Sequence, residues 1–213
     1  MTDTLSWLAE PESIAFGGYS VVLARGLEPA ELVARIAAET FPRRTARPLG
    51  PSTAEDLIEE HELDLMSGTE DVALRYGQAG DLAFAVAYGY WQGELALPAS
   101  VSRGGAEVYH VEYEEENGKP VPPQFDSSRD GQPLCFFNLH LDASWGRDGV
   151  DGDPATAAAV TADLAAAGLP DPERSRRDVH RSCLELLGRR FGLALPRAAV
   201  LDGELPAVLL EAA

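Results

Sequence analysis

The segment from Leu82 to Trp91 constrains the fold most strongly, because it alternates between two kinds of side chain and yet has no polar face. One set is bulky and the other is small: Leu82, Phe84, Val86, Tyr88 and Tyr90 against Ala83, Ala85, Ala87 and Gly89. Successive side chains of a strand point to opposite faces of its sheet. We therefore expect a central strand that is covered on both sides, with a helix packed closely on the small face.

The rest of the sequence predicts more strands and then helices. Alternating apolar residues and turn signals predict strands at 19–24, 72–76, 106–113, 124–128 and 134–141, the last two joined as a hairpin at Asp130–Gly131. Glu28 and Pro29 predict the start of a helix, and Leu57 and Ile58 predict a short one. Capping and stop signals predict four C-terminal helices, at 154–168, 172–192, 196–201 and 205–211. Residues 42–53, rich in Arg and Pro, are expected to form a mobile loop.

This order of elements predicts an α+β fold. We expect a mainly antiparallel sheet of about five or six strands, with one N-terminal helix packed on it and a helical C-terminal region. The sheet domain should occupy residues 1–143, and the helical region 144–213 should pack on the same core as part of a single domain.

Charge and composition exclude several classes of function. The chain has 35 acidic and 17 basic residues, for a formal net charge of −18, which argues against a nucleic-acid binder with a general basic surface. No apolar run is long enough to span a bilayer, and the N-terminus lacks the features of a secretory signal. The two cysteines favour a reduced, cytoplasmic protein. The common nucleotide-binding and hydrolase motifs are missing.

Two predicted strands carry residues that suit a metal site. His110 and Glu112 share a face of one strand, and His140 and Asp142 share a face of the other. If the strands are neighbours, two imidazoles and two carboxylates can converge on a divalent metal or act as an acid–base pair. The alternative is a polar, solvent-facing side of the sheet.

Three other patterns have simpler structural explanations. A zinc site from Cys135, His140, His180 and Cys183 is disfavoured, since a regular strand sends Cys135 and His140 to opposite faces. The aspartates of 148–153 lack the calcium-loop pattern, and Asp153 is expected to cap a helix. The arginines of 174–190 are expected to pair with carboxylates on their own helix rather than to bind nucleic acid.

The order of several landmarks resembles a family of uncharacterised actinobacterial domains of unknown function. The landmarks are Trp7-Leu8, the run Tyr19–Leu27 before a helix, Ser102–Gly105 before a strand, Asp130–Gly131 and Trp145–Asp148. They cover most of the chain, but they are turns and strand starts, and the family has no agreed activity to transfer. The resemblance implies a cytoplasmic bacterial accessory protein, and some relatives look like antitoxin or immunity proteins.

We therefore expect a non-enzymatic, acidic, cytoplasmic protein without a cofactor, which binds a basic protein partner such as a toxin enzyme and neither nucleic acid nor a membrane. The alternative is a metal-dependent enzyme that uses His110, Glu112, His140 and Asp142, while a third possibility is a purely structural subunit. The residues expected to contact the partner are two groups of carboxylates and two tryptophans: Glu55, Asp56, Glu59, Glu60, Glu62, Asp64, Glu112, Glu114, Glu115, Glu116, Trp91 and Trp145.

Overall fold

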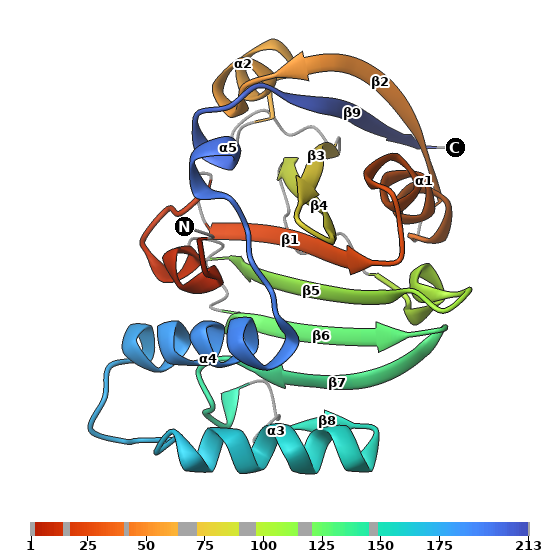
Figure 1. Ribbon diagram of the computed structural model, residues 1–213. Helices are drawn as coiled ribbons and strands as arrows, with labels where there is room; N and C mark the ends of the chain where they lie inside the picture. Colours follow the sequence, from red (N-terminus) through yellow and green to blue (C-terminus); the bar gives the residue numbers. More distant parts are fainter. Residues whose placement is uncertain are drawn as a thin grey trace.

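The fold is built on one sheet. The computed structural model describes residues 3–14, 18–40, 43–63, 72–89, 97–114, 121–144 and 149–212. Its nine strands are all antiparallel to their neighbours, in the order β2-β9-β3-β4-β1-β5-β6-β7-β8 (Figure 1). The strands are β1 (Gly18–Arg25), β2 (Arg44–Ser52), β3 (Val72–Ala79), β4 (Leu82–Gly89), β5 (Glu107–Glu114), β6 (Gln124–Arg129), β7 (Gln132–Asn138), β8 (Asp151–Gly152) and β9 (Leu205–Ala212).

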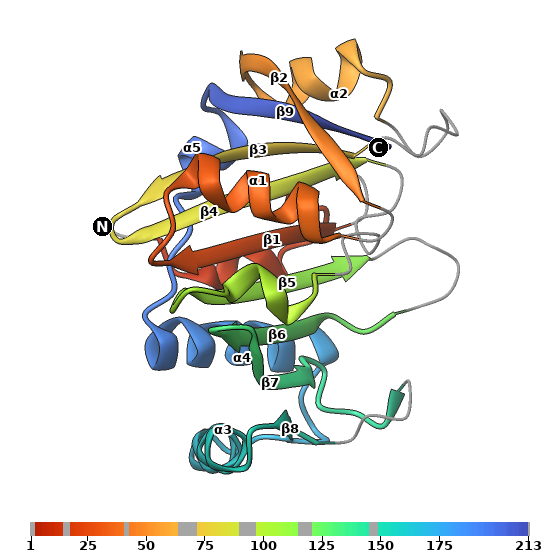
Figure 2. The ribbon, with the colours of Figure 1, turned by 90° about the vertical axis from the view of Figure 1, so that its right-hand side faces the viewer.

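Helices cover both faces of this sheet. Figure 2 shows α1 in front of β3, β4 and β1, with α4 behind the sheet. The helical elements are η1 (Leu5–Ala9), α1 (Pro29–Glu39), α2 (Ala54–Glu60), η3 (Ala99–Ser102), α3 (Pro154–Ala166), α4 (Arg176–Phe191) and α5 (Arg197–Leu201). The α+β class is confirmed, but the expected five or six strands are wrong, because the sheet has nine.

The two faces of β4 differ as its sequence predicts. Ala83, Ala85 and Ala87 lie in one core cluster with Leu32 and Ile36 of α1, where small side chains let the helix approach the sheet. The bulky side chains of β4 belong to a second core, which also contains η1, α4 and the central residues of α5. β4 is therefore a central strand, buried on both faces.

The helix boundaries follow local capping chemistry. Asp153 caps α3 by accepting a hydrogen bond from the Thr156 amide at 2.9 Å. The second predicted C-terminal helix begins later than expected, because Ser175 caps α4 by accepting from the Asp178 amide. Asp171 instead forms a turn by accepting from the amide of Glu173.

The predicted mobile loop at 42–53 is wrong, since most of it forms β2. Pro48 and Pro51 lack the amide hydrogens that a central strand needs. Their presence argued against a strand, so the sequence pattern did not predict β2. β2 is an edge strand that pairs with β9 alone, and its register shifts between Pro48 and Gly50. An edge strand tolerates proline because one of its sides needs no hydrogen bonds.

The predicted helix at 205–211 is also wrong, since these residues form β9. β9 lies between β2 and β3, and its central residues, Ala207 to Leu210, are buried. A short continuous apolar run fits a strand buried on both faces as well as a helix, and pairing with two strands decides in favour of the strand. The C-terminal region is therefore not purely helical, and it contributes β8 and β9 to the same sheet as residues 1–143.

A buried arginine fixes the corner where β2, β3 and α5 meet. The side chain of Arg75 is 0 % exposed and donates to the carbonyl oxygens of Ser52, Val200 and Gly203, and to the Tyr88 hydroxyl at 2.9 Å. Breaking such a network would leave a buried cation without acceptors. Because Ser52 stands just before α2, Arg75 also holds the position of that helix.

Candidate functional site

The predicted partner-binding residues do not form one surface. Glu55, Asp56, Glu59, Glu60 and Glu62 are exposed on or just after α2, and we call them the α2 surface. Asp64, Glu115, Glu116, Trp91 and Trp145 lie outside the described residues. The remaining two, Glu112 and Glu114, are partly buried on β5.

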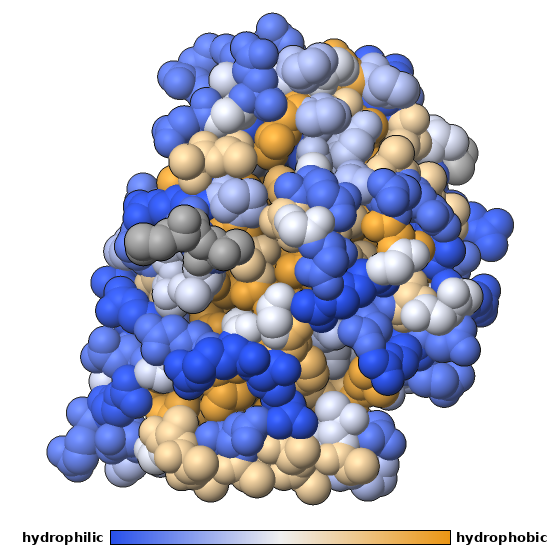
Figure 3. All heavy atoms as spheres, viewed as in Figure 1, coloured by the Kyte–Doolittle hydropathy of each residue, from blue (hydrophilic) through white to orange (hydrophobic). Residues whose placement is uncertain are grey.

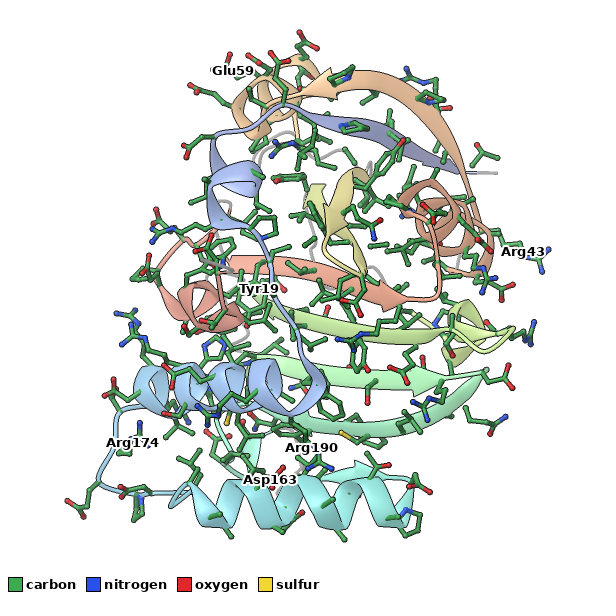
Figure 4. The ribbon with its side chains drawn as sticks, in the orientation of Figure 1. Tyr19, Arg43, Glu59, Asp163, Arg174 and Arg190 are labelled. Carbon is green, nitrogen blue, oxygen red and sulfur yellow. The ribbon has the colours of Figure 1, made fainter. Side chains whose placement is uncertain are left out.

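The α2 surface stands out at one corner of the molecule. Hydrophilic residues cover this corner, and Glu59 points away from the sheet, whereas Arg43 lies at the far end of β2 (Figures 3 and 4). Within the described ranges, none of the α2-surface carboxylates forms an ion pair. Exposed Asp202 and Glu204, in the segment that leads into β9, add two carboxylates close by, since Leu205 pairs with Ser52.

The helix dipole of α2 favours some of the α2-surface carboxylates and disfavours others. Glu55 and Asp56 occupy the first turn, where the helix dipole favours negative charge. Glu59 and Glu60 occupy the last turn and Glu62 follows it, where the dipole disfavours negative charge. Residues four apart face each other on a helix, so Glu55 also repels Glu59.

The four residues of the metal hypothesis do not come together. β6 lies between β5 and β7, so the two strands are not neighbours. β7 also ends at Asn138, so His140 and Asp142 follow the predicted strand instead of lying on it. His110 bonds to Ser20 on the side of the sheet that α1 covers, whereas His140 contacts Tyr113 and His180 on the side that α4 covers. No group of three or more His, Cys, Asp or Glu side chains among the described residues is placed to hold a metal ion.

His110 and Glu112 form a separate polar group beside α1. Their side chains lie 3.9 Å apart, from Nε2 to Oε2. Burial lowers the pKa of His110 to about 4. Burial, together with the charges of Asp126 and Glu114, raises the pKa of Glu112 to about 7. His110 also lines a pocket of about 220 Å³ together with Asp126 and Cys135.

The other sequence patterns have structural roles. Cys135 and Cys183 are buried and unpaired, and burial raises the pKa of their thiols to about 11 and 12. Thiols that stay protonated are poor nucleophiles and poor zinc ligands. On α4, Arg181 lies 3.9 Å from Asp178, while Arg190 pairs with Asp163 of α3 between the two helices (Figure 4).

A cluster of four rings forms the most specific arrangement on the α4 side of the sheet, and the sequence did not predict it. Gly18 begins β1 at φ +129°, and a Cβ there would lie 1.9 Å from the Tyr113 carbonyl oxygen, so glycine permits this close approach of β1 and β5. The next residue, Tyr19, then pairs with Tyr113. The rings of Tyr19 and Tyr113 contact His180, and Tyr113 also contacts His140.

A buried hydrogen bond joins His180 to Tyr19. The Tyr19 hydroxyl and His180 Nε2 are 2.6 Å apart in a buried setting. Burial, followed by the charges of His140, Arg177 and Arg181, lowers the pKa of His180 to about 3, and burial raises the pKa of Tyr19 well above its usual value. At neutral pH the phenol is therefore protonated and the imidazole is neutral. The two side chains therefore form this hydrogen bond as neutral groups.

The three outer rings of this cluster line a pocket of about 510 Å³. Tyr113, His140 and His180 belong to its lining, and so do Ser175, Arg176 and Arg177 at the start of α4. We call it the α4 pocket. Arg176 also pairs with Asp142 at 2.8 Å. Burial acts to raise the pKa of Asp142, but hydrogen bonds from Ser144 and Asn138 and the charge of Arg176 lower it to about 2.

Comparison with known proteins identifies no relative: no protein-family model, curated protein or solved structure matches the chain. Among the described residues, none of the helices has the length and apolarity required to cross a membrane.

Proposed function

We propose that this protein is a non-enzymatic, acidic, cytoplasmic binding protein that docks onto a basic protein partner through the α2 surface. In the role that the family resemblance suggests, the partner is a toxin enzyme and the chain is its antitoxin or immunity protein. The two buried, unpaired cysteines support a reducing compartment.

The observation that carries the proposal is the placement of Glu59, Glu60 and Glu62 at the end of α2. Helix stability does not account for them, because the helix dipole and the neighbouring carboxylates both disfavour negative charge there. Solubility does not require them either, since a net charge of −18 exceeds what a small domain needs. A cationic partner would remove both penalties and gain charge complementarity.

The surface also has the geometry of a docking site. α2 projects from the sheet edge beside β2, where no other helix of the described chain covers it (Figure 1). The field of the whole acidic molecule would attract a basic partner and raise its association rate, and salt would weaken the complex. The metal-dependent alternative has no comparable support, because its histidines lie on opposite faces of the sheet.

The test uses two triple variants that lose the same number of negative charges. Glu59→Gln/Glu60→Gln/Glu62→Gln neutralises the end of α2. Glu28→Gln/Asp151→Asn/Glu173→Gln neutralises three exposed carboxylates elsewhere on the surface, which form no ion pair among the described residues. The wild type and both variants serve as baits in lysates of the native host, and bound proteins are identified by mass spectrometry at low and high salt.

We expect the wild type and the second variant to recover the same basic protein at low salt, and the first variant to lose it. We also expect the first variant to be folded and no less stable than the wild type, which excludes unfolding as the cause. Recovery of no basic protein, or equal loss from both variants, would contradict docking through α2.

A further inference from the structure

A pocket on the α1 side of the sheet combines an apolar lining with a few polar side chains. The segment 97–102, which contains η3, packs on β5, β6 and β7 (Figure 2), and this region contains a space of about 220 Å³. We call it the η3 pocket. Most of its lining is apolar, from Leu97, Pro98, Ala99, Val108, Pro133 and Phe136. His110, Asp126 and Ser128 contribute polar side chains to the same lining.

One of these polar side chains is buried and has an unused hydrogen-bonding atom. His110 is 5 % exposed, and its one hydrogen bond among the described residues joins Nε2 to the Ser20 hydroxyl at 3.0 Å. The other ring nitrogen, Nδ1, has no partner in the described part of the chain, and solvent can reach it. Because burial lowers the pKa of His110 to about 4, the imidazole is neutral at neutral pH.

The surroundings of Nε2 favour a ligand that donates a hydrogen bond to Nδ1. The Ser20 hydroxyl can donate or accept, so its bond to Nε2 is compatible with a proton on either ring nitrogen. Glu112 Oε2 lies 3.9 Å from Nε2 and has no hydrogen-bond partner within the described ranges. An ionised Glu112 therefore stabilises a proton on Nε2, and Nδ1 is then an acceptor.

Two residues of β6 add acceptor oxygens to the pocket. Ser128 is 9 % exposed, and its hydroxyl has no hydrogen bond among the described residues. Asp126 is the cross-strand partner of His110, and its negative charge acts on Glu112 close by. No positively charged side chain occurs among the described residues that line the pocket. The polar part of the pocket therefore suits a ligand that carries hydrogen-bond donors and a positive charge.

We infer that the η3 pocket binds a small primary amine with an apolar body. The ammonium group donates to Nδ1 of His110 and to the Ser128 hydroxyl, the Asp126 carboxylate attracts it, and the apolar body contacts the apolar lining. A cavity of about 150 Å³ accommodates a benzene ring. The η3 pocket, at about 220 Å³, therefore suits a ring with a short aminoalkyl arm. This inference is independent of the α2 surface.

The test uses three probes of nearly equal size that differ in charge. Calorimetry measures the affinity of the full chain for benzylamine, which is a cation at neutral pH, for neutral benzyl alcohol and for anionic benzoate. We expect saturable binding of benzylamine. Benzyl alcohol should bind about tenfold more weakly, because charge-assisted hydrogen bonds are roughly twice as strong as neutral ones. Benzoate should not bind, since its charge has the same sign as that of Asp126.

Two substitutions in the pocket and one control test the contacts. Asp126→Asn removes the charge from the pocket, and we expect it to weaken benzylamine binding about threefold. Ser128→Ala removes an acceptor of the ammonium group and should weaken binding about tenfold. The matched control, Asp202→Asn, removes an exposed charge beside β9, which lies toward the other edge of the sheet from β6. Salt screens a charge at such a distance, so the control should bind like the wild type.

Nitrogen-15 spectra of the histidine rings show which imidazole the amine reaches. Nδ1 of His110 should shift during the benzylamine titration, whereas His140 and His180, on the other side of the sheet, should not. The inference is overturned if benzylamine does not bind, or if benzyl alcohol or benzoate binds as tightly. It is equally overturned if Asp126→Asn and Asp202→Asn have the same effect, if Ser128→Ala binds like the wild type, or if His110 does not respond.

Discussion

The end of α2 and the start of α4 carry charges of opposite sign, and in both places the helix dipole disfavours the charge. α2 places Glu59 and Glu60 in its last turn, and α4 places Arg176 and Arg177 in its first turn, so each helix has charges that its own dipole disfavours. The other ends follow the usual rule, with Glu55 in the first turn of α2 and Arg189 in the last turn of α4. The departures are therefore local to one end of each helix.

The surroundings of these two helix ends differ. α2 has one buried residue, Leu57, at 1 % exposure, and its carboxylates stand in open solvent. α4 buries most of its inner face, and its first turn lines the α4 pocket together with the buried ring of His180. The exposed carboxylates of α2 can therefore contact a macromolecule, whereas Arg176 already pairs with Asp142.

The largest expected effect is a loss of folding stability when the pH is lowered. The neutral forms of His110, His140 and His180 contribute stability that is fully present above the unfolded pKa of about 6.5 and is lost as the pH falls toward 4 and 3. Glu112 acts in the opposite direction, because its raised pKa gives stability below about 4.5 that is lost as the pH rises through 7. The histidines outnumber it, so we expect a net loss of roughly 3 kcal/mol between pH 7 and pH 5.

Urea unfolding at the two pH values measures this loss, and hydrogen exchange locates it. The amides of α4 should lose protection at pH 5 before those of the sheet centre. Glu112→Gln removes the opposing contribution, so its loss of stability should be larger than that of the wild type. A variant curve that is flat over this range would show that the imidazoles are not held neutral by burial.

The next effect concerns the buried hydrogen bond behind the α4 pocket. Tyr19→Phe leaves Nε2 of His180 without its hydrogen-bond partner, and we expect a loss of about 2 kcal/mol in the free energy of unfolding. Tyr76→Phe is the matched control, because the Tyr76 hydroxyl has no hydrogen bond among the described residues, and it should change stability by less than about 0.5 kcal/mol. Equal effects of the two substitutions would mean that Tyr19 contributes through packing alone.

The smallest effect tests the two ends of α2 against each other. Glu59→Gln/Glu60→Gln should raise the free energy of unfolding by a few tenths of a kcal/mol, because it removes charges that the dipole disfavours. Glu55→Gln/Asp56→Asn removes the same charge from the favoured end and should lower it by about 0.5 kcal/mol. Thermal unfolding at low salt measures whether each double variant is more or less stable than the wild type. If both variants change stability in the same direction, the helix dipole does not distinguish the two ends of α2.

Local patterns predicted much of the fold. The apolar alternation of 82–90, the cap at Asp153 and the Asp130–Gly131 turn each depend on neighbouring residues, and the structure contains the corresponding elements. β2 and β9 depend on each other instead. Their pairing joins Arg44 to Ala212, which are far apart in the sequence. The prolines of β2 argue against a strand, and the short apolar run of β9 fits a helix as well as a strand, so neither segment is predicted from its own residues.

The candidate sites also differ in how far the sequence alone indicated them. The α2 carboxylates lie within one short stretch of the sequence, residues 55–62, so the sequence alone indicated them. His140 and His180 were each noted, but the contacts of His180 with Tyr19 and with His140 depend on how β1, β5 and α4 pack. The glycine at position 18 offered only a weak signal of the close contact between β1 and β5. Packing, rather than spacing, assembled the pocket.

The position of β9 has a consequence for synthesis on the ribosome. β2 has β9 as its strand partner, and the Arg75 network that holds the start of α2 also needs Val200 and Gly203. Residues 44–60 leave the ribosome long before these late residues, so the corner that carries α2 is completed last. A nascent chain therefore cannot complete the corner that carries α2 until residues 200–212 have been synthesised.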